Sequence, residues 1–273
     1  MSGWHTLDAP AKLNLALVVG PPRPDGKHEV VTVLERLTLV DTIGVRRASV
    51  TNVAGFDDDT LVRAALDKLT RRAGGHVRFE ARIEKRIPVA AGLAGGSSDA
   101  AAALLLASEL LESTLSTDEL DAVAASLGAD VPFFLREGPQ LATGDGTTLA
   151  GLTLPRTYVV LLVLPEGATK SSTADVYAAF DRRRGDEGYD DRRTRLLRAI
   201  DGLASASDLA TLPPSDLASS PLSAELRRLG AFRADVTGAG PVVYGLFVDR
   251  AAAERARDRL DTRIAETWIA EPR

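Results

Sequence analysis

The sequence contains no cysteine and only three histidines, His5, His28 and His76. The absence of cysteine excludes a disulfide scaffold, a thiolate zinc site, an iron–sulfur centre and a cysteine nucleophile. Three histidines scattered along the chain also argue against a multi-histidine metal site. Any chemistry that this chain performs therefore depends on other side chains and on the backbone.

Lysine is almost as scarce, because the 33 basic residues comprise 5 lysines and 28 arginines. A GC-rich coding bias that replaces interchangeable lysines by arginines accounts for most of this difference. The lysines that survive are worth locating, since a compact ammonium shifts its pKa far more readily than a guanidinium does. They are Lys12, Lys27, Lys68, Lys85 and Lys170.

The sequence shows no targeting or membrane-spanning segment. The N-terminal residues M-S-G-W-H-T-L-D lack the basic start and apolar core of a signal peptide. The longest apolar run at helical positions, 100–107, is far shorter than the roughly 20 residues that span a bilayer. The net charge of −5 gives no reason to expect a nucleic acid or an anionic membrane as partner. We expect a cytoplasmic protein, either a monomer or a homodimer.

Strands and helices alternate along the chain, but without the regularity of a parallel doubly wound sheet. We therefore predict an α+β fold with two domains, residues 1–153 and 154–273. Strands are expected at 13–18, 30–40, 43–50, 77–83, 158–164, 232–237 and 242–248. Helices are expected at 61–74, 97–112, 117–127, 173–183, 190–202 and 251–260, and a loop at 204–222.

The strongest local signal is the glycine-rich segment P-V-A-A-G-L-A-G-G-S-S-D-A, residues 88–100. Its glycines permit close backbone approach, and its serines precede a strongly apolar helix. A glycine loop that leads into a helix N-terminus suits a phosphate group, because backbone N–H groups and the helix dipole point at one place. The segment matches neither the Walker A pattern nor G-x-G-x-x-G. A flexible turn followed by an ordinary helix cap stays open as the alternative.

Three further segments combine polar residues with apolar surroundings. A-P-A-K-L-N-L at 9–15 places Lys12 and Asn14 on one strand face, which is more often simply the solvated side. S-L-G-A-D-V-P-F-F-L at 126–135 places Asp130 among apolar residues, where a carboxylate is costly unless it is paired or functional. T-G-A-G-P at 237–241 joins two apolar stretches and by itself predicts a hairpin turn.

These four segments, in this order and with these spacings, resemble the GHMP kinases, the family of galactokinase, homoserine kinase and mevalonate kinase. The resemblance covers about residues 8–260. It implies a two-domain GHMP-kinase architecture with an N-terminal, ATP-binding, ribosomal-protein-S5-like domain and a C-terminal ferredoxin-like α+β domain. The activity that it implies is transfer of a phosphoryl group from ATP to a small alcohol.

The segments R-P-D-G-K-H-E-V at 23–30, G-G-S-S-D-A-A and L-G-A-D-V-P-F-F-L resemble members of this family whose alcohol substrate carries a cytidine diphosphate group. The resemblance implies that Lys12 and Asp130 form the catalytic pair. It implies that ATP phosphates are bound by Pro88, Val89, Ala90, Ala91, Gly92, Leu93, Ala94, Gly95, Gly96, Ser97 and Ser98. The residues expected to bind the other substrate are Asn14, His28, Tyr177, Thr237 and Gly238. A hydroxyl of Ser97 or Ser98 is the expected protein ligand of magnesium.

The chain departs from the family pattern at three places. Lys27 stands before His28, where an aromatic residue is usual, so one side of the expected stack around the cytosine is missing. Ser215-Asp216-Leu217 stands where Asn-Asp-Leu is usual, and Ala91 and Ala94 stand at positions where glycine is frequent. None of these residues belongs to the expected catalytic pair.

Three other functions stay open at this point. The first is a GHMP kinase that acts on another small alcohol, such as homoserine or mevalonate. The G-K-H-E-V segment is the feature expected to distinguish this chain from such a kinase. A nucleotide-binding module without catalysis would usually lack the lysine or the aspartate, and both are present here. An RNA-binding protein is considered because the N-terminal kinase fold is shared with ribosomal and translation-factor domains, but the negative net charge opposes it.

Overall fold

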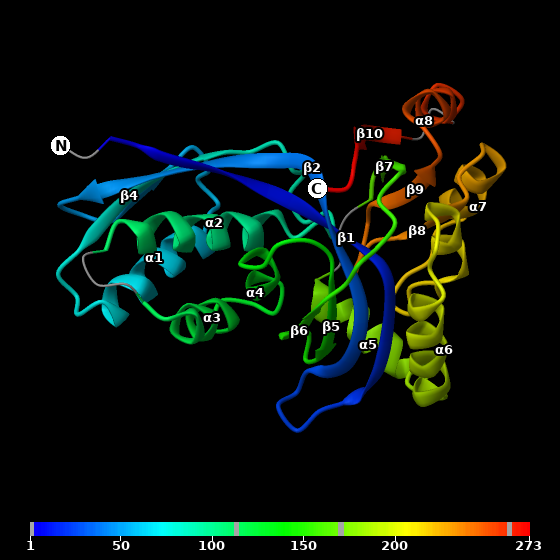
Figure 1. The fold of residues 1–273 in the computed structure, drawn as a ribbon, viewed down its shortest axis with the longest axis horizontal. Coiled ribbons are helices and arrows are strands. Elements are labelled where there is room, and N and C mark those ends of the chain that lie inside the picture. Colours follow the sequence, from blue (N-terminus) through cyan, green and yellow to red (C-terminus); the bar gives the residue numbers. More distant parts are fainter. Residues whose placement is uncertain (1–2, 112–114, 169–171, 261–263) are drawn as a thin grey trace. The chain divides into compact units, whose positions relative to one another are not determined.

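The computed structural model describes residues 3–111, 115–168, 172–260 and 264–273. Its contacts group the chain into two compact units that interleave along the sequence. Unit 1 comprises Met1–Ala11, Val40–Val89 and Ala94–Glu137, and unit 2 comprises Lys12–Leu39, Ala90–Leu93 and Gly138–Arg273. Both units combine strands with helices, as the α+β prediction requires (Figure 1). The predicted boundary at residue 153, as a division of the sequence, stays a prediction.

Two long strands begin the chain, β1 (His5–Pro22) and β2 (His28–Ala48), and they pair with each other. The stretches 30–40 and 43–50, expected as separate strands, form one strand that runs through Asp41 and ends at Ala48. Residues 9–20 of β1 are buried without interruption, so the alternation of polar and apolar residues does not mark an exposed face. Each of the two strands contributes residues to both units.

The sheet of unit 1 is built on the second half of β2. Residues Thr42–Ala48 pair antiparallel with β4 (Arg78–Glu84), and the short strand β3 (Asn52–Ala54) pairs parallel with β4. The register sets Ile43 opposite Ile83, and both side chains are buried. Because alternate residues point to the same side of a strand, this face of the sheet is apolar and faces the core.

Four helices complete unit 1: α1 (Leu61–Arg72), α2 (Gly95–Glu109), α3 (Thr117–Ala125) and α4 (Val131–Phe134). Helix α1 packs against α2 and buries Val62, Leu66 and Leu69 at helical spacing. Figure 1 shows α1, α2 and α3 grouped on one side of the strands of unit 1. Helix α2 ends at Glu109, earlier than expected, and the predicted end at residue 112 lies outside the described residues.

Unit 2 contains a four-stranded antiparallel sheet with the order β10-β7-β9-β8. Its strands are β7 (Val159–Pro165), β8 (Arg233–Val236), β9 (Val243–Phe247) and β10 (Ile264–Ala270). Its helices are α5 (Thr173–Arg182), α6 (Tyr189–Asp201), α7 (Pro221–Arg228) and α8 (Arg250–Arg257). In chain order, β7 is followed by a helical crossover, by β8 and β9, by α8 and finally by β10. This order is the expected ferredoxin-like arrangement.

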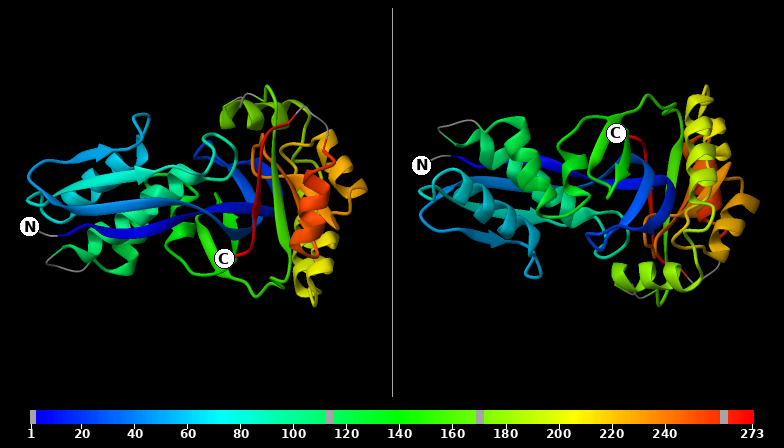
Figure 2. Two further views of the ribbon diagram at one scale, coloured as in Figure 1. Left: turned by 90° about the horizontal axis from the view of Figure 1, so that it is seen from above. Right: turned by 90° about the horizontal axis from the view of Figure 1, so that it is seen from below.

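Helices α7 and α8 cover one face of this sheet, on the same side in both views of Figure 2. The core between them is formed by strand residues such as Leu161, Val243 and Phe247, by Leu226 of α7 and by Ala253 of α8. All five are buried completely. Their side chains are aliphatic or aromatic, so this half of unit 2 is held by ordinary apolar packing.

The remaining strands of unit 2 extend from the first half of β2. Residues 30–34 pair antiparallel with β5 (Gln140–Gly144), which turns back into β6 (Thr148–Gly151). The last residues of the chain also bind β2: the Thr38 N–H donates to the Glu271 carbonyl at 2.9 Å, and the Arg273 N–H donates to the Arg36 carbonyl at 2.9 Å. Sequence reasoning did not predict β5, β6 or β10.

The expected loop at 204–222 is only partly irregular. It contains a 3-10 helix, Ala206–Thr211, and helix α7 begins at Pro221.

Within the residues that the structure describes, no helix is long and apolar enough to cross a membrane.

Candidate active site

Lys12 and Asn14 of β1 are both buried in unit 2, with 4% and 5% of their surface exposed. The Lys12 ammonium donates to the Asn14 side-chain oxygen at 2.5 Å. The Asn14 amide nitrogen donates to the Thr32 hydroxyl of β2 at 2.8 Å, and that hydroxyl donates to the Ala16 carbonyl at 2.7 Å. This chain of hydrogen bonds fixes which end of the Asn14 amide faces the ammonium. The face that carries Lys12 and Asn14 is therefore an ordered, buried polar site rather than a solvated strand face.

The turn between β8 and β9 lies against these two side chains. The Asn14 N–H donates to the Thr237 hydroxyl at 3.1 Å. A Cβ atom on Gly238 would lie 3.3 Å from the Asn14 side-chain oxygen and 3.6 Å from the Lys12 ammonium. Glycine at this position thus permits the turn to approach the ammonium closely. Two segments more than 200 residues apart in the sequence meet at one point.

The middle of the glycine-rich loop, residues 90–93, belongs to unit 2 and lies at the same point. The Lys12 N–H donates to the Leu93 carbonyl at 3.0 Å, and the Val242 N–H donates to the Ala91 carbonyl at 3.3 Å. Gly92 adopts a φ of +84°, and a Cβ atom there would lie 2.5 Å from the Thr237 carbonyl oxygen. Lys12, Asn14, the glycine-rich loop and the T-G-A-G-P turn therefore form one constellation.

The substitution Gly92→Ala tests this close approach. Its positive φ costs about 1–3 kcal/mol in a non-glycine residue, and its Cβ atom would force the loop away from Thr237. We expect the KM for ATP to rise at least about tenfold, measured by steady-state kinetics. Gly75→Ala is the matched control, because Gly75 also has a φ of +84° but has no atom within 4 Å of the Cβ position. Equal KM values in the two variants would contradict the argument.

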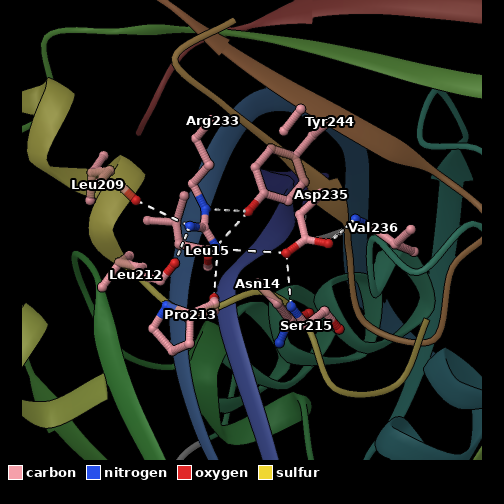
Figure 3. A network of polar contacts seen from close by, with 12 residues as sticks. Asn14, Leu15, Leu209, Leu212, Pro213, Ser215, Arg233, Asp235, Val236 and Tyr244 are labelled. Carbon is pink, nitrogen blue, oxygen red and sulfur yellow. Dashed lines mark hydrogen bonds and ion pairs between the residues drawn. The ribbon is translucent and has the colours of Figure 1, made fainter. Parts of the chain in front are cut away.

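A buried network supports β1 from the side of the four-stranded sheet (Figure 3). The Tyr244 hydroxyl donates to the Leu15 carbonyl at 3.1 Å and accepts from the Arg233 guanidinium at 2.9 Å. The same guanidinium donates to the carbonyls of Leu209, Leu212 and Pro213 at 3.2, 2.6 and 2.9 Å. Since Leu15 follows Asn14 directly, this network fixes the backbone that carries the site. Sequence reasoning missed Arg233, because nothing in the sequence distinguishes it among the 28 arginines.

The last part of the glycine-rich segment, residues 94–100, belongs to unit 1 and forms the start of α2. Ala94 is the N-cap residue with a left-handed backbone, φ 54°, and Gly95, Gly96 and Ser97 form the first turn. Backbone N–H groups in a first turn have no partner within the helix, and the helix dipole favours an anion there. Ser98 follows in the same turn, and its buried hydroxyl has no hydrogen-bond partner among the described residues. An oxygen atom of this kind fits the hard-cation preference of magnesium.

A charged cluster supports the segment that enters this loop in unit 1. The Lys85 ammonium donates to Asp41 at 2.5 Å and to Asp99 of α2 at 2.8 Å. Asp41, fully buried, also accepts the N–H groups of Arg86 and Ile87 at 2.5 and 2.8 Å. Burial raises the pKa of Asp99 to about 7, with Lys85 opposing this shift and Asp41 adding to it. Sequence reasoning missed this cluster, although the scarcity of lysine marks Lys85 as clearly as it marks Lys12.

Asp130 lies in unit 1 as the N-cap residue of α4. It is half-buried, and the helix residues that follow it, including Val131 and Phe133, are buried. Its side chain makes no capping hydrogen bond to α4. The expected pairing of Asp130 with Lys12 stays a prediction.

His28 and Tyr177 come together in unit 2, as expected for residues of one subsite. Their ring centroids are 4.8 Å apart, and the His28 Nε2 atom lies 2.8 Å from the Asp181 carboxylate. Lys27 instead pairs with Asp145 at 2.6 Å. Burial raises the pKa of Asp145, but hydrogen bonds from Lys27 and Thr147 outweigh it and hold this pKa at about 2. The Lys27 ammonium, which precedes His28 in the chain, is therefore paired with an ionised carboxylate.

The described residues hold no group of three or more histidine, aspartate or glutamate side chains that could bind a metal ion together. The assignment of the Ser98 hydroxyl as a magnesium ligand stays a prediction. Ser97, one residue earlier in the same turn, is half-buried.

Comparison with known proteins identifies the family of this chain. The family GHMP kinases N terminal domain matches residues 60–138, and GHMP kinases C terminal matches residues 218–265. The 4-diphosphocytidyl-2-C-methyl-D-erythritol kinase of Syntrophomonas wolfei is 34% identical over 96% of both chains. That of Nocardia farcinica is 39% identical over 85% of this chain and 81% of its own.

A solved structure shares the fold over almost the whole length. The crystal structure of a 4-(cytidine 5'-diphospho)-2C-methyl-D-erythritol kinase aligns with a TM-score of 0.79 and 29% identity, covering 98% of this chain and 99% of that one. This chain belongs to the GHMP kinases and, within them, to the family of 4-diphosphocytidyl-2-C-methyl-D-erythritol kinases.

Proposed function

We propose that this chain phosphorylates the 2-hydroxyl of 4-(cytidine 5'-diphospho)-2-C-methyl-D-erythritol with ATP, a step of the non-mevalonate pathway of isoprenoid synthesis. The observation that carries the proposal is the constellation of Lys12, Asn14, Gly92, Thr237 and Gly238 in unit 2. It joins an ammonium, a fixed amide and a glycine-rich backbone, which are the parts that a phosphoryl-transfer site needs. Family membership supports both the kinase activity and the substrate.

The glycine-rich segment, residues 88–98, holds the phosphates of ATP in this proposal. The first-turn N–H groups of α2 and its dipole favour the negative charge of the phosphates. The hydroxyl of Ser98, with Ser97 beside it, is the protein ligand for magnesium. A magnesium ion held there would supply positive charge that offsets the negative charge of the phosphates.

Lys12 and Asp130 divide the chemistry between them. Asp130 orients the attacking hydroxyl and accepts its proton. Lys12 stabilises negative charge on the transferring oxygens. Asn14 fixes the direction of the ammonium through the 2.5 Å hydrogen bond.

His28 and Tyr177 bind the cytidine part of the alcohol substrate in this proposal. The Asp181 carboxylate orients the His28 ring through Nε2, which leaves Nδ1 to face the base. Lys27 precedes His28 directly, and its exposed ammonium pairs with Asp145 at 2.6 Å. Recognition therefore combines one aromatic face with a fixed charge instead of two aromatic faces.

The substitution His28→Ala should weaken binding of the cytidylyl alcohol and spare binding of ATP. We expect its KM for the alcohol to rise about tenfold, because the imidazole proposed to face the base is removed and Tyr177 and Asp181 lose the ring that they contact. Steady-state kinetics with each substrate varied in turn checks this. His76→Ala, which removes an exposed histidine of unit 1, is the control. Equal effects of His28→Ala on both KM values would remove His28 from the substrate site.

An ADP-release assay tests the function as a whole. The cytidylyl alcohol, homoserine and mevalonate are offered separately at equal concentrations, with ATP and with magnesium present or chelated. We expect turnover with the cytidylyl alcohol alone, and only in the presence of magnesium. Turnover with homoserine or mevalonate would assign another GHMP kinase activity. Binding of ATP without any turnover would indicate a nucleotide-binding module.

A further inference from the structure

Asp216 occupies the edge of β1 that β2 does not cover. The Asp216 N–H donates to the Leu17 carbonyl at 2.9 Å, and its side chain accepts the Val19 N–H at 2.8 Å. The Val19 carbonyl accepts from the Arg192 guanidinium at 3.1 Å. Leu17 and Val19 are two residues apart, so their backbone groups point to the same edge of the strand. One aspartate and one arginine thus take the place of a neighbouring strand.

The same two residues tie two helices to this edge. The Arg192 guanidinium, from α6, donates to the Asp216 carboxylate at 3.1 Å and to the Gly185 carbonyl at 2.7 Å. The guanidinium of Arg183, the C-cap residue of α5, donates to the Asp216 carbonyl. Asp216 is therefore the junction at which β1, the end of α5 and the start of α6 meet.

Helix α5 carries the side chains that contact His28. Tyr177 stacks on the His28 ring, and the Asp181 carboxylate binds its Nε2 atom. A small apolar cluster fills the space beneath these side chains, formed by Leu17, Val19, Val30, Phe180 and Leu217. Since close-packed clusters transmit displacements rather than absorb them, a shift of α5 against β1 moves Tyr177 and His28 as well.

We propose that Asp216 is a positioning residue for binding of the cytidylyl substrate. By fixing the edge of β1 to α5 and α6, it holds His28 and Tyr177 in place relative to Lys12 and Asn14. This role rests on the proposed function, in which His28 and Tyr177 bind the cytidine diphosphate group. Asp216 itself does not touch the reacting atoms in this proposal.

The test compares three variants of the full chain by calorimetric titration with cytidine diphosphate and, separately, with ATP and magnesium. Asp216→Ala removes both carboxylate contacts, and we expect its affinity for cytidine diphosphate to fall about tenfold with ATP affinity changed less than about twofold. Asp216→Asn keeps an oxygen that accepts the Val19 N–H, so we expect it to recover most of the loss. Asp190→Ala, an exposed aspartate at the start of α6, is the matched control and should behave as the unmodified protein.

A purely structural role for Asp216 would lower both affinities in parallel, together with the unfolding temperature, and that result would overturn the inference. Unchanged affinity for cytidine diphosphate in Asp216→Ala would overturn it as well. If Asp216→Ala fails to fold, Arg192→Lys decides the question, because it should weaken cytidine diphosphate binding selectively. An unmodified protein that binds cytidine diphosphate but does not phosphorylate the cytidylyl alcohol would refute the proposed function alone. Absence of any binding of cytidine diphosphate to the unmodified protein would refute both.

Discussion

Asp130→Asn should lower kcat by at least about a hundredfold while leaving the KM for ATP within about twofold of its original value. Asparagine has nearly the shape of aspartate, but it cannot accept the proton of the attacking hydroxyl. A positioned general base contributes about 10²–10⁴ to a rate, so the loss should reach at least the lower figure. Steady-state ADP release with the cytidylyl alcohol measures this effect.

This substitution should change the charge of the side chain and leave the fold unchanged. The Asp130 side chain is half-buried at the N-cap position of α4, and asparagine fills nearly the same volume there. We therefore expect the unfolding temperature to stay within about 2 °C. Asp118→Asn, at an exposed position in the first turn of α3 in the same unit, is the matched control and should keep full activity. Near-normal turnover of Asp130→Asn would remove the assigned role.

Lys12→Arg should also lower kcat by about a hundredfold or more, although the positive charge is kept. The Lys12 ammonium lies 2.5 Å from the Asn14 oxygen and 3.6 Å from the Cβ position of Gly238. A guanidinium is planar and larger, so it would displace Asn14 or the Gly238 turn. Overpacking of a buried site costs about 1–3 kcal/mol, and here the displaced groups belong to the site itself.

Two measurements separate this loss of chemistry from loss of folding. Circular dichroism should show an unchanged spectrum for Lys12→Arg, and ATP binding should weaken far less than kcat falls. Lys68→Arg is the control, because Lys68 of α1 binds Ser126 within unit 1 and has no assigned role in catalysis. If Lys12→Arg retains the original activity, a lysine is not specifically required.

The sequence predicted correctly that Lys12 and Asn14 share a face of β1, because alternation along a strand depends only on local geometry. It did not predict that this face is buried, since the residues that cover it come from elsewhere in the chain. Thr237 and Thr32, for example, lie 223 and 18 residues from Asn14. What covers a strand face is a property of the tertiary fold and leaves no local signal.

Two of the elements that the sequence did not predict, β10 and α7, escaped prediction for different reasons. Strand β10, I-A-E-T-W-I-A, gains its register from pairing with β7 about 100 residues earlier in the chain, which periodicity does not reveal. Helix α7 did carry a signal, because Ser220 followed by Pro221 is a typical N-cap and first-turn pair. The surrounding serines and prolines of 204–222 outweighed it and favoured a loop.

The residues that we propose to support the site leave little local signal in the sequence. Asp216 belongs to the tripeptide Ser215-Asp216-Leu217, whose only signal in the sequence is that it departs from the family pattern. Its partners Val19 and Arg192 lie far from it in the sequence. Lys85, like Lys12, is one of only five lysines in the chain, but it lies outside the motifs that resemble the family. The catalytic candidates came from recognisable motifs, whereas their supports depend on contacts between distant segments.

The pairing of residues 271–273 with 36–38 bears on how the chain folds as it is synthesised. The Glu271 N–H donates to the Thr38 hydroxyl at 2.9 Å, a contact between residues 233 positions apart. Strand β2 is synthesised more than 200 residues before these partners, so unit 2 cannot be completed until residues 271–273 have left the ribosome. Nascent chains stalled before residue 271 should therefore remain sensitive to protease in unit 2, and they should expose its apolar strands to chaperones until release.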